Sequence, residues 1–318
     1  MLQGKFVVSL DFEMMWGVRD KRTIASYGNN IEAVRTIIPR LVEMAEEAGV
    51  HLTFGVVGML MLKDKKELLA HIPKTIPSYN DAIRSPYGSY IENMSPDDES
   101  YHFASDMVEY IKNHPQHEIG SHTYCHYYCL EEGQTIDQFE TDLAMAQTIA
   151  DGNLKSIIFP RNQTNQSYLE ICKKYGIKAY RGNEDNKLNT PSAHEGKLKR
   201  LLRLLDNYFN LTGYNTYTNE QLLASGEPMN IPASRFLRPF SRKLSFLDGL
   251  RLRRIKNAMT HAAKKGETFH VWWHPHNFGD YTEENFTFLK KIFSHYKYLN
   301  DKYNFTSMTM SEVYDSLK

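Results

Sequence analysis

Two histidines four residues apart, His122 and His126, are the first candidates for chemistry in this 318-residue chain, in the stretch "HEIGSHTYCH" (117–126). Side chains at positions i and i+4 project from one side of a helix or helical turn, so both imidazoles can bind one ion, about 2.0–2.1 Å from each nitrogen. In a chain with thirteen histidines, such a pair also arises by chance. The spacing permits a metal site, but a third ligand is needed to support it.

Other side chains capable of acid–base or metal chemistry follow short apolar runs. They are Asp11 and Glu13 after 5–10, Arg161 after 156–160, and His274 and His276 after 269–273. In an extended segment, residues two apart face the same side, so Asp11 and Glu13 can reach one site. The carboxyl ends of parallel strands meet at one edge, where α/β folds bind their ligands. We therefore predict a metal or acid–base site that these residues share with the two histidines.

Each candidate also has a purely structural interpretation. Asp11 and Glu13 could be a helix N-cap and a surface charge, and Arg161 could cover a strand end. Cys125 and Cys129 could complete a closed Cys2His2 zinc site with the histidines. Four ligands so close in sequence do not easily surround an ion tetrahedrally, which makes that site the weaker interpretation.

The elements that must position these residues are short buried strands alternating with helices. Seven apolar runs have the length and composition of buried strands. They are "KFVVSLD" (5–11), "HLTFGVVG" (51–58), "HEIGSH" (117–122), "SIIFP" (156–160), "IKAYRG" (177–182), "FHVWWH" (269–274) and "NFTSMT" (304–309). Helical patterns separate most of them, including one that opens with a Thr135-x-x-Gln138 capping box. This alternation predicts a parallel sheet with crossover helices, closed or nearly closed into a barrel.

Two segments interrupt the alternation. Residues 74–103 are rich in Pro, Ser, Asp and Tyr and indicate a long loop, and residues 183–250 contain an irregular insert before the last strands. Loops of such length usually carry function. No internal repeat is visible, and we predict one domain over residues 1–318 that contains both inserts.

Composition restricts the class of protein. Lys+Arg and Asp+Glu balance at 38 each, so global charge indicates no nucleic-acid partner, and the apolar content is that of a soluble globular protein. The first apolar run, 6–10, is too short for a signal peptide or a membrane span. Three cysteines, an odd number without an export signal, favour a reducing compartment. We expect a cytoplasmic protein with no membrane span.

Six motifs, in order along the chain, resemble those of the polysaccharide deacetylase, or NodB-homology, family of carbohydrate esterases. They are "SLDFE" (9–13), "TFGVVG" (53–58), "GSHTYCH" (120–126), "FPRN" (159–162), "WWHPH" (272–276) and "TSMTMSEV" (306–313). The resemblance covers most of the chain, is weakest over 183–250, and is most specific at the carboxylate pair followed by His-x3-His. It implies a distorted (β/α)7 barrel and a divalent metal, with Zn²⁺ first and Co²⁺, Mn²⁺, Fe²⁺ or Ni²⁺ as alternatives.

The resemblance also implies a role for each site residue. Asp11 matches the catalytic base, Arg161 the arginine that holds this base, and His274 the general acid. The metal ligands are matched by Glu13, His122 and His126.

The chain departs from the family pattern in three places. The usual adjacent Asp-Asp is Asp-Phe-Glu here, and the usual Arg-x-Pro-Tyr is "PRNQ", so we expect a different sugar-facing surface beside Arg161. The stretch "WWHPHNF" offers both His274 and His276 as the acid. We prefer His274, the first residue past the apolar run.

Residue chemistry is consistent with these roles. A carboxylate and two neutral imidazoles leave room for water on a zinc ion, which lowers the pKa of that water to about 7 and polarises an amide carbonyl. Asp11 would take the proton of the attacking water, Arg161 would keep Asp11 ionised by pairing with it, and His274 would protonate the leaving amine.

We therefore predict a metal-dependent hydrolase that removes acetyl from an N-acetylated sugar in cytoplasmic polysaccharide or surface-glycan biosynthesis. One alternative is hydrolysis of a cyclic imide or ureide on the same fold. The other is a carbohydrate-binding homologue without activity.

Further residues are predicted to contact the substrate. Trp16 and Trp273 are candidates for stacking on a sugar ring, with His276 as a further contact. Between Lys197 and Lys256 the chain is strongly basic, and Arg235 and Arg238 lie in its non-helical part, "SRFLRPFSRK" (234–243). These arginines could grip a phosphate of a nucleotide- or lipid-linked sugar, and solvated helix faces are the alternative.

Overall fold

The structure, a computed structural model, describes residues 3–184 and 197–318. Within these ranges, nine strands form one sheet in which every strand pairing is parallel. The strand order is β6-β5-β4-β3-β2-β1-β8-β7, with β9 beside β1. The strands are β1 (Lys5–Phe12), β2 (Leu52–Val56), β3 (Glu118–Ser121), β4 (Ser156–Ile158), β5 (Ala179–Arg181), β6 (Met229–Asn230), β7 (Arg235–Phe236), β8 (Thr268–Trp273) and β9 (Thr306–Ser307).

One segment, 229–237, joins the two edges of this sheet. β6 pairs with β5, and β7 pairs with β8. Between them, the amide of Ala233 donates to the carbonyl of Gly182 (3.0 Å), and the amide of Ser234 donates to the carbonyl of His270 (2.7 Å). The sheet thus curls into a distorted barrel with seven strand positions, which are filled by β1 to β5, the segment 229–237 and β8. The predicted (β/α)7 architecture is confirmed.

All seven predicted strands are present, but only six of them occupy strand positions of the barrel. β9 is a two-residue addition beside the start of β1. The seventh strand position of the barrel is filled by β6 and β7. Both lie in the segment 183–250, which the sequence indicated as irregular. Strands of two residues are too short to show the alternating pattern by which strands are recognised.

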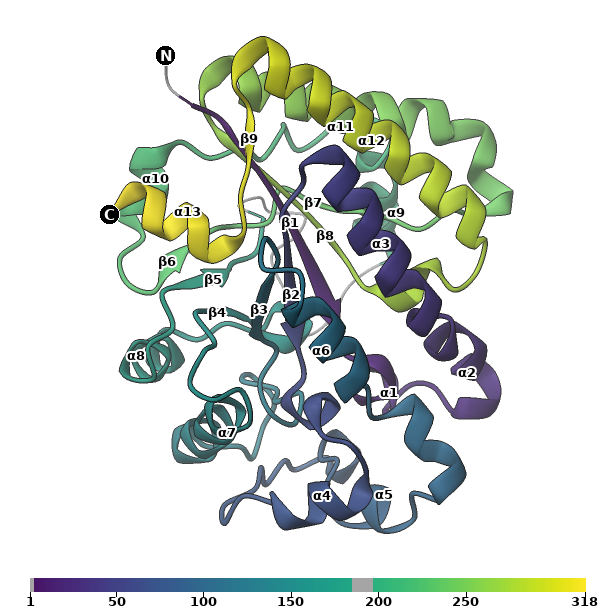
Figure 1. The fold of residues 1–318 in the computed structure, drawn as a ribbon, viewed down its shortest axis with the longest axis vertical. Coiled ribbons are helices and arrows are strands. Elements are labelled where there is room, and N and C mark those ends of the chain that lie inside the picture. The colour runs from purple at the N-terminus through teal and green to yellow at the C-terminus, as the bar shows by residue number, and fades with distance from the viewer. Residues whose placement is uncertain (1–2, 185–196) are drawn as a thin grey trace.

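Helices surround the strands, with α3, α11 and α12 on one side of the barrel and α7 and α8 on another (Figure 1). Thr135 accepts a hydrogen bond from the amide of Gln138, as the predicted capping box requires. The helices are α1 (Met14–Val18), α2 (Ile24–Glu32), α3 (Val34–Ala48), α4 (Lys65–Ala70), α5 (Ser89–Glu92), α6 (Ser105–Lys112), α7 (Ile136–Ile149), α8 (Gln166–Lys174), α9 (Lys197–Asp206), α10 (Asn219–Ala224), α11 (Asp248–Lys265), α12 (Thr282–Tyr303) and α13 (Met310–Leu317).

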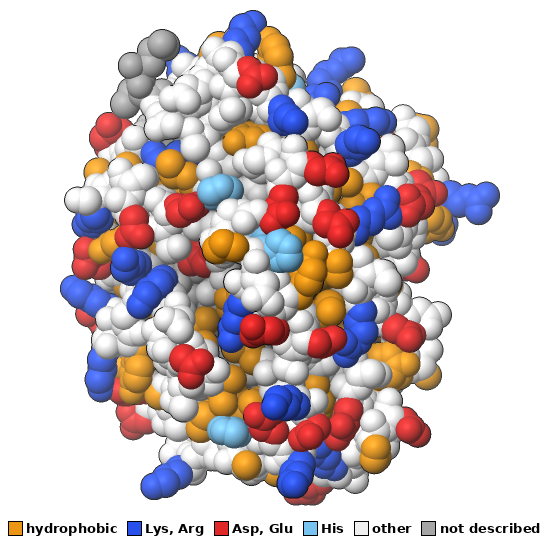
Figure 2. Space-filling model, viewed as in Figure 1, with side chains coloured by type: hydrophobic (Ala, Val, Ile, Leu, Met, Phe, Trp, Pro, Cys, Tyr) orange, Lys and Arg blue, Asp and Glu red, His pale blue; other side chains and the backbone are white. Residues whose placement is uncertain are grey.

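Apolar burial and surface charge follow the usual division between core and surface. All eight residues of β1 are buried, at the centre of the sheet. On the face drawn in Figure 2, Lys and Arg side chains are interspersed with Asp and Glu. In the part of the chain that the structure describes, no helix combines the length and apolarity needed to cross a membrane.

Candidate metal and acid–base site

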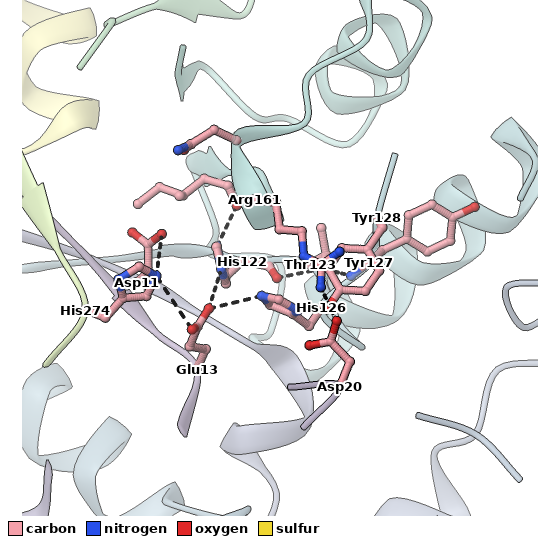
Figure 3. A network of polar contacts seen from close by, with 12 residues as sticks. Asp11, Glu13, Asp20, His122, Thr123, His126, Tyr127, Tyr128, Arg161 and His274 are labelled. Carbon is pink, nitrogen blue, oxygen red and sulfur yellow. Dashed lines mark hydrogen bonds and ion pairs between the residues drawn. The ribbon is translucent and has the colours of Figure 1, made fainter. Parts of the chain in front are cut away.

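Glu13, His122 and His126 meet at the carboxyl ends of the central strands. Glu13 directly follows β1 and His122 directly follows β3. Glu13 Oε2 lies 3.2 Å from His122 Nε2 and 3.0 Å from His126 Nε2, and one ligand atom from each residue lies within 4.8 Å of the others. All three side chains are buried. Figure 3 shows the carboxylate of Glu13 pointing toward both imidazoles. The structure thus brings together the three residues that the sequence predicted as metal ligands.

The two histidines do not lie on a helical turn, which corrects the geometry expected from their spacing. Residues 122–128 form an irregular loop in which Thr123 (φ 63°) and His126 (φ 61°) have left-handed backbone conformations. Asp142, on α7, accepts hydrogen bonds from the amides of Tyr124 (2.8 Å) and Cys125 (3.0 Å). Thr123 Oγ1 accepts another from the amide of Tyr127 (2.7 Å). Hydrogen bonds to the loop backbone, instead of helical periodicity, hold the imidazoles in place.

The protonation of the ligands fits a cation. His122 Nδ1 lies 2.8 Å from the carbonyl oxygen of Ile158, so this nitrogen carries the proton and donates. In neutral His122, Nε2 then presents a lone pair to Glu13, which is itself an acceptor. Burial, offset in part by Glu13, lowers the pKa of His126 to about 4, so His126 is neutral at neutral pH. Lone pairs that converge in this way are what a divalent metal needs, and the hydrogen bond on His122 Nδ1 fixes the tautomer that can bind it.

Glu13 is held ionised, as a ligand must be. Burial alone would raise its pKa, but the neighbouring imidazoles of His274, His122 and His126 lower it well below the usual value. One carboxylate and two imidazoles could therefore hold zinc or a similar divalent ion, with coordination positions left for water and substrate.

Asp11 is paired with Arg181, not with Arg161 as the sequence predicted. Arg181 Nη1 donates to Asp11 Oδ1 (2.6 Å), and Arg181 Nη2 donates to Asp11 Oδ2 (2.8 Å). Both side chains are buried. Burial would raise the pKa of Asp11, but the guanidinium of Arg181 lowers it below its usual value. The carboxylate is ionised, and the two parallel hydrogen bonds fix its plane.

Arg161 instead belongs to a separate ion cluster. It pairs with Asp20 and lies 3.4 Å from Glu131, and its guanidinium stacks 4.2 Å from the ring centre of Tyr128. Arg161 itself has φ 54°, in a turn just past β4, whereas Arg181 is the last residue of β5. A signal for Arg181 was present in "IKAYRG": it lies at the carboxyl end of a predicted strand, as Asp11 does.

His274 lies beside both carboxylates. Its Nε2 is 3.7 Å from Asp11 Oδ2 and 3.6 Å from Glu13 Oε1 (Figure 3). His276 stacks behind it, with ring centres 5.0 Å apart, and burial lowers the pKa of His276 to about 3. The geometry therefore favours His274 over His276 as the proton donor, and its role as general acid stays a prediction.

A buried chain of hydrogen bonds extends from Asp11 through Arg181 into the barrel. Arg181 Nη1 donates to Ser9 Oγ (3.1 Å), and Ser9 Oγ lies 2.8 Å from His270 Nε2. His270 Nδ1 lies 2.9 Å from the carbonyl of Ile231, which fixes the orientation of the ring. Sequence patterns gave no signal for Ser9 or His270, because both stand inside strands instead of at their ends.

The two tryptophans predicted to stack on sugar are buried. Trp16 and Trp273 have no exposed surface. Trp16 Nε1 donates to the carbonyl of His102 (2.6 Å), and Trp273 stacks on Phe278. Trp272 is the tryptophan that reaches a cavity, because side chains alternate along β8 and its neighbour points into the core.

Arg235 and Arg238 both line the cavity beside Trp272, but they differ in their contacts. Arg235 is buried and donates to Asp206 Oδ2 (2.9 Å). Because its guanidinium is already paired with this carboxylate, the predicted phosphate contact of Arg235 is corrected. Arg238 is half-buried, and among the described residues its guanidinium makes no hydrogen bond or ion pair. The side chains of Lys197 and Arg200, also in the basic segment, lie outside the described part of the structure.

No protein-family model and no curated protein matches the chain. Solved structures do. A proposed polysaccharide deacetylase from Mycobacterium smegmatis is similar with a TM-score of 0.59 at 14% identity, over 98% of this chain and 89% of that one. The α-amylase AmyC from Thermotoga maritima reaches 0.54 at 10% identity, over 99% and 75%. A GH57-type branching enzyme from Pyrococcus horikoshii reaches 0.50 at 11%, over 98% and 70%.

These neighbours carry different activities on one architecture, so the likeness establishes the fold and leaves the activity to the site. The first of them agrees with the resemblance found in the sequence motifs. The chain therefore has the distorted barrel fold that it shares with this deacetylase structure.

Proposed function

We propose that this protein is a metal-dependent hydrolase that removes the acetyl group from an N-acetylated sugar. The observation that supports the proposal is that two neighbouring carboxylates have different contacts. Asp11 is held by a guanidinium, while Glu13 faces two imidazoles. An ionised base, three metal ligands and a histidine next to both are the groups that amide hydrolysis needs.

Each side chain has one task in this reaction. Glu13, His122 and His126 would hold a divalent metal, which would supply an activated water and polarise the amide carbonyl. Asp11 accepts a proton from the attacking water, and Arg181 holds the Asp11 carboxylate in position. His274 donates a proton to the sugar nitrogen as the C–N bond breaks. The products are acetate and a free amino sugar.

The two alternatives give different products. Hydrolysis of a cyclic imide or ureide would use the same groups but open a ring without releasing acetate. A carbohydrate-binding homologue would release nothing. The deacetylase proposal is supported over the second alternative because the base, the ligands and the candidate acid are all present and close together.

Acetate release tests the proposal directly. The protein, loaded in turn with Zn²⁺, Co²⁺, Mn²⁺, Fe²⁺ and Ni²⁺, is incubated with chitooligosaccharides, nucleotide sugars and lipid-linked sugars. We expect acetate from at least one substrate and none from the Asp11→Asn variant. Ring-opening of a small imide without acetate from any sugar would contradict the proposal.

The proposal includes a reducing compartment and one functional unit. Cys125, Cys129 and Cys172 are buried and unpaired, which suits the cytoplasm. We propose that residues 1–318 work as one barrel domain on a carbohydrate, without a nucleic-acid partner.

A further inference from the structure

We propose that a cavity beside the metal and acid–base site binds an anionic group on the sugar, a carboxylate or a phosphate, through Arg238. This inference rests on the proposed function and names its substrate class. The cavity has a volume of about 420 Å³, and its lining includes Asn162, Arg235, Phe236, Arg238 and Trp272.

The walls of this cavity are the immediate neighbours of the reacting groups. Trp272 lies edge-on to His274, with ring centres 5.6 Å apart, and the guanidinium of Arg181 lies 4.1 Å from the Trp272 ring. Asn162 Oδ1 accepts from Arg181 Nη2 (2.9 Å). A sugar whose acetamido group reaches Glu13 and His274 would therefore place a neighbouring substituent in this cavity, with Trp272 available to the ring face.

Positive charge is crowded behind the cavity. Asp206 accepts from Arg235 (2.9 Å) and lies 3.7 Å from Arg254, so one carboxylate serves two guanidiniums. Burial, and after it the charge of Arg235, lowers the pKa of Arg254 to about 10. The cavity lining as a whole contains three arginines (Arg203, Arg235 and Arg238) and two acids (Glu184 and Asp206), so cations exceed acids by one even before Arg254 is counted. Buried cations without enough counter-ions are costly, and an anion in the cavity would offset that cost.

Arg238 is the arginine in this group that is placed to take the anion. Arg235 is committed to Asp206, whereas the Arg238 guanidinium has no partner among the described residues. The backbone of Arg238 is fixed, because Arg251 donates to its carbonyl oxygen and to that of Pro239. A half-buried guanidinium on a fixed backbone can form two parallel hydrogen bonds to a carboxylate or a phosphate.

The test compares matched substrates and matched variants. Arg238→Gln removes the charge from the cavity, and Arg253→Gln removes the same charge from the exposed face of α11. The substrates are one N-acetyl sugar as its neutral methyl glycoside, its sugar phosphate and its uronic acid. For Arg238→Gln we expect KM on at least one charged substrate to rise roughly 10-fold or more, less so at high salt, and KM on the neutral glycoside to change little. Arg253→Gln should behave as the unmodified protein.

Two outcomes separate this inference from the proposed function. If the neutral sugar is deacetylated and Arg238→Gln changes KM equally on all three substrates, or on none, the anion site is wrong and the function stands. A binding measurement needs no turnover: inorganic phosphate and glucuronate should raise the melting temperature of the unmodified protein more than that of Arg238→Gln. If that difference appears while no sugar releases acetate, the anion site stands and the proposed function fails. The substrate arm with the larger KM effect identifies the anion as phosphate or carboxylate.

Discussion

Asp11 and Glu13 both carry a carboxylate and lie two positions apart in the sequence, but different side chains surround them. Arg181 occupies both oxygens of Asp11, whereas Glu13 offers an oxygen to His122 and His126. A carboxylate already paired to a guanidinium is a poor metal ligand but an oriented acceptor for a proton. The proposed assignment of base and ligand therefore rests on the neighbours of each carboxylate and not on its own type.

This assignment predicts which substitutions lose activity and which lose metal. Asp11→Asn should abolish turnover while the protein keeps roughly one metal per chain. Glu13→Ala and His122→Ala should lose the metal, because each removes one of three ligands. Elemental analysis of the purified variants measures the metal content per chain and so tests the assignment. Metal loss in Cys125→Ala and Cys129→Ala, with metal retained in Glu13→Ala, would transfer the site to the thiols.

Arg181 and Arg161 can be separated by the same kind of measurement. Arg181→Gln leaves a buried Asp11 without its counter-charge, and we expect kcat to fall by a factor on the order of 10² or more. Arg181→Lys should recover part of this loss, because the charge remains but the two parallel hydrogen bonds do not. Arg161→Gln should cost less in kcat, because Arg161 contacts Asp20 and Glu131 and not Asp11. A larger loss from Arg161→Gln would restore the family assignment.

His274 gives a prediction that depends on the leaving group. His274→Ala should lower the rate on an N-acetyl sugar by roughly 10²–10⁴, since an amine must be protonated as it leaves. An activated acetyl ester, whose leaving group needs no proton, should be affected less. His276→Ala provides the comparison, since that ring lies behind His274. Equal losses on amide and ester would mean that His274 serves binding or structure.

At the scale of elements, helix α7 positions the loop 122–128, which carries His122 and His126, through one buried carboxylate. Asp142 accepts the amides of Tyr124 and Cys125, and burial raises its pKa to about 6. An unfolded aspartate has a pKa of about 3.9, so the folded protein binds this proton more tightly than the unfolded chain. Asp142 therefore contributes most to stability below about pH 4, and this contribution is lost as the pH rises through about 6.

The corresponding prediction uses Asp142→Asn, which removes the titration. The free energy of unfolding of the variant relative to that of the unmodified protein should rise by roughly 3 kcal/mol between about pH 4 and pH 7. Urea unfolding at several pH values measures it. Asp137→Asn, at an exposed position on the first turn of the same helix, is the control for removing a carboxylate that is not buried. A flat difference for Asp142→Asn would show that the Asp142 carboxyl does not titrate in this range.

The elements themselves were mostly predictable, and the exceptions have physical causes. Runs such as 5–11 and 269–274 are long, apolar and β-branched or aromatic, so their strands follow from local pattern. β6 and β7 consist of two residues each, and their pairing with β5 and β8 depends on contacts distant in sequence. The left-handed backbone of Thr123 and His126 could not be predicted from the sequence either. The His-x3-His spacing therefore predicted correctly that the two imidazoles converge, but not the backbone conformation that brings them together.

At the scale of the whole molecule, the barrel determines which side chains meet. Residues at strand ends converge, which is why Asp11, Glu13, His122 and His274 could be predicted as neighbours from the sequence. The choice between Arg161 and Arg181 could not be predicted, since both follow apolar runs and only the closed barrel shows which one reaches Asp11. The cavity beside Trp272 was equally hidden, because its walls come from segments far apart in sequence.

Metal binding should also stabilise the whole barrel, because the ligands come from segments that only the fold brings together. Glu13 lies near the N-terminus, and the two histidines lie more than a hundred residues later, so the unfolded chain offers no preformed site. A metal that binds only the folded state, present at about 100 times its Kd, adds roughly 2.7 kcal/mol to the free energy of unfolding. The melting temperature of the chelator-treated protein should therefore rise by a few degrees on addition of Zn²⁺. Glu13→Gln should lose this rise, whereas Glu284→Gln, at an exposed position on α12, should keep it. An equal rise in Glu13→Gln would place the stabilising metal elsewhere on the molecule.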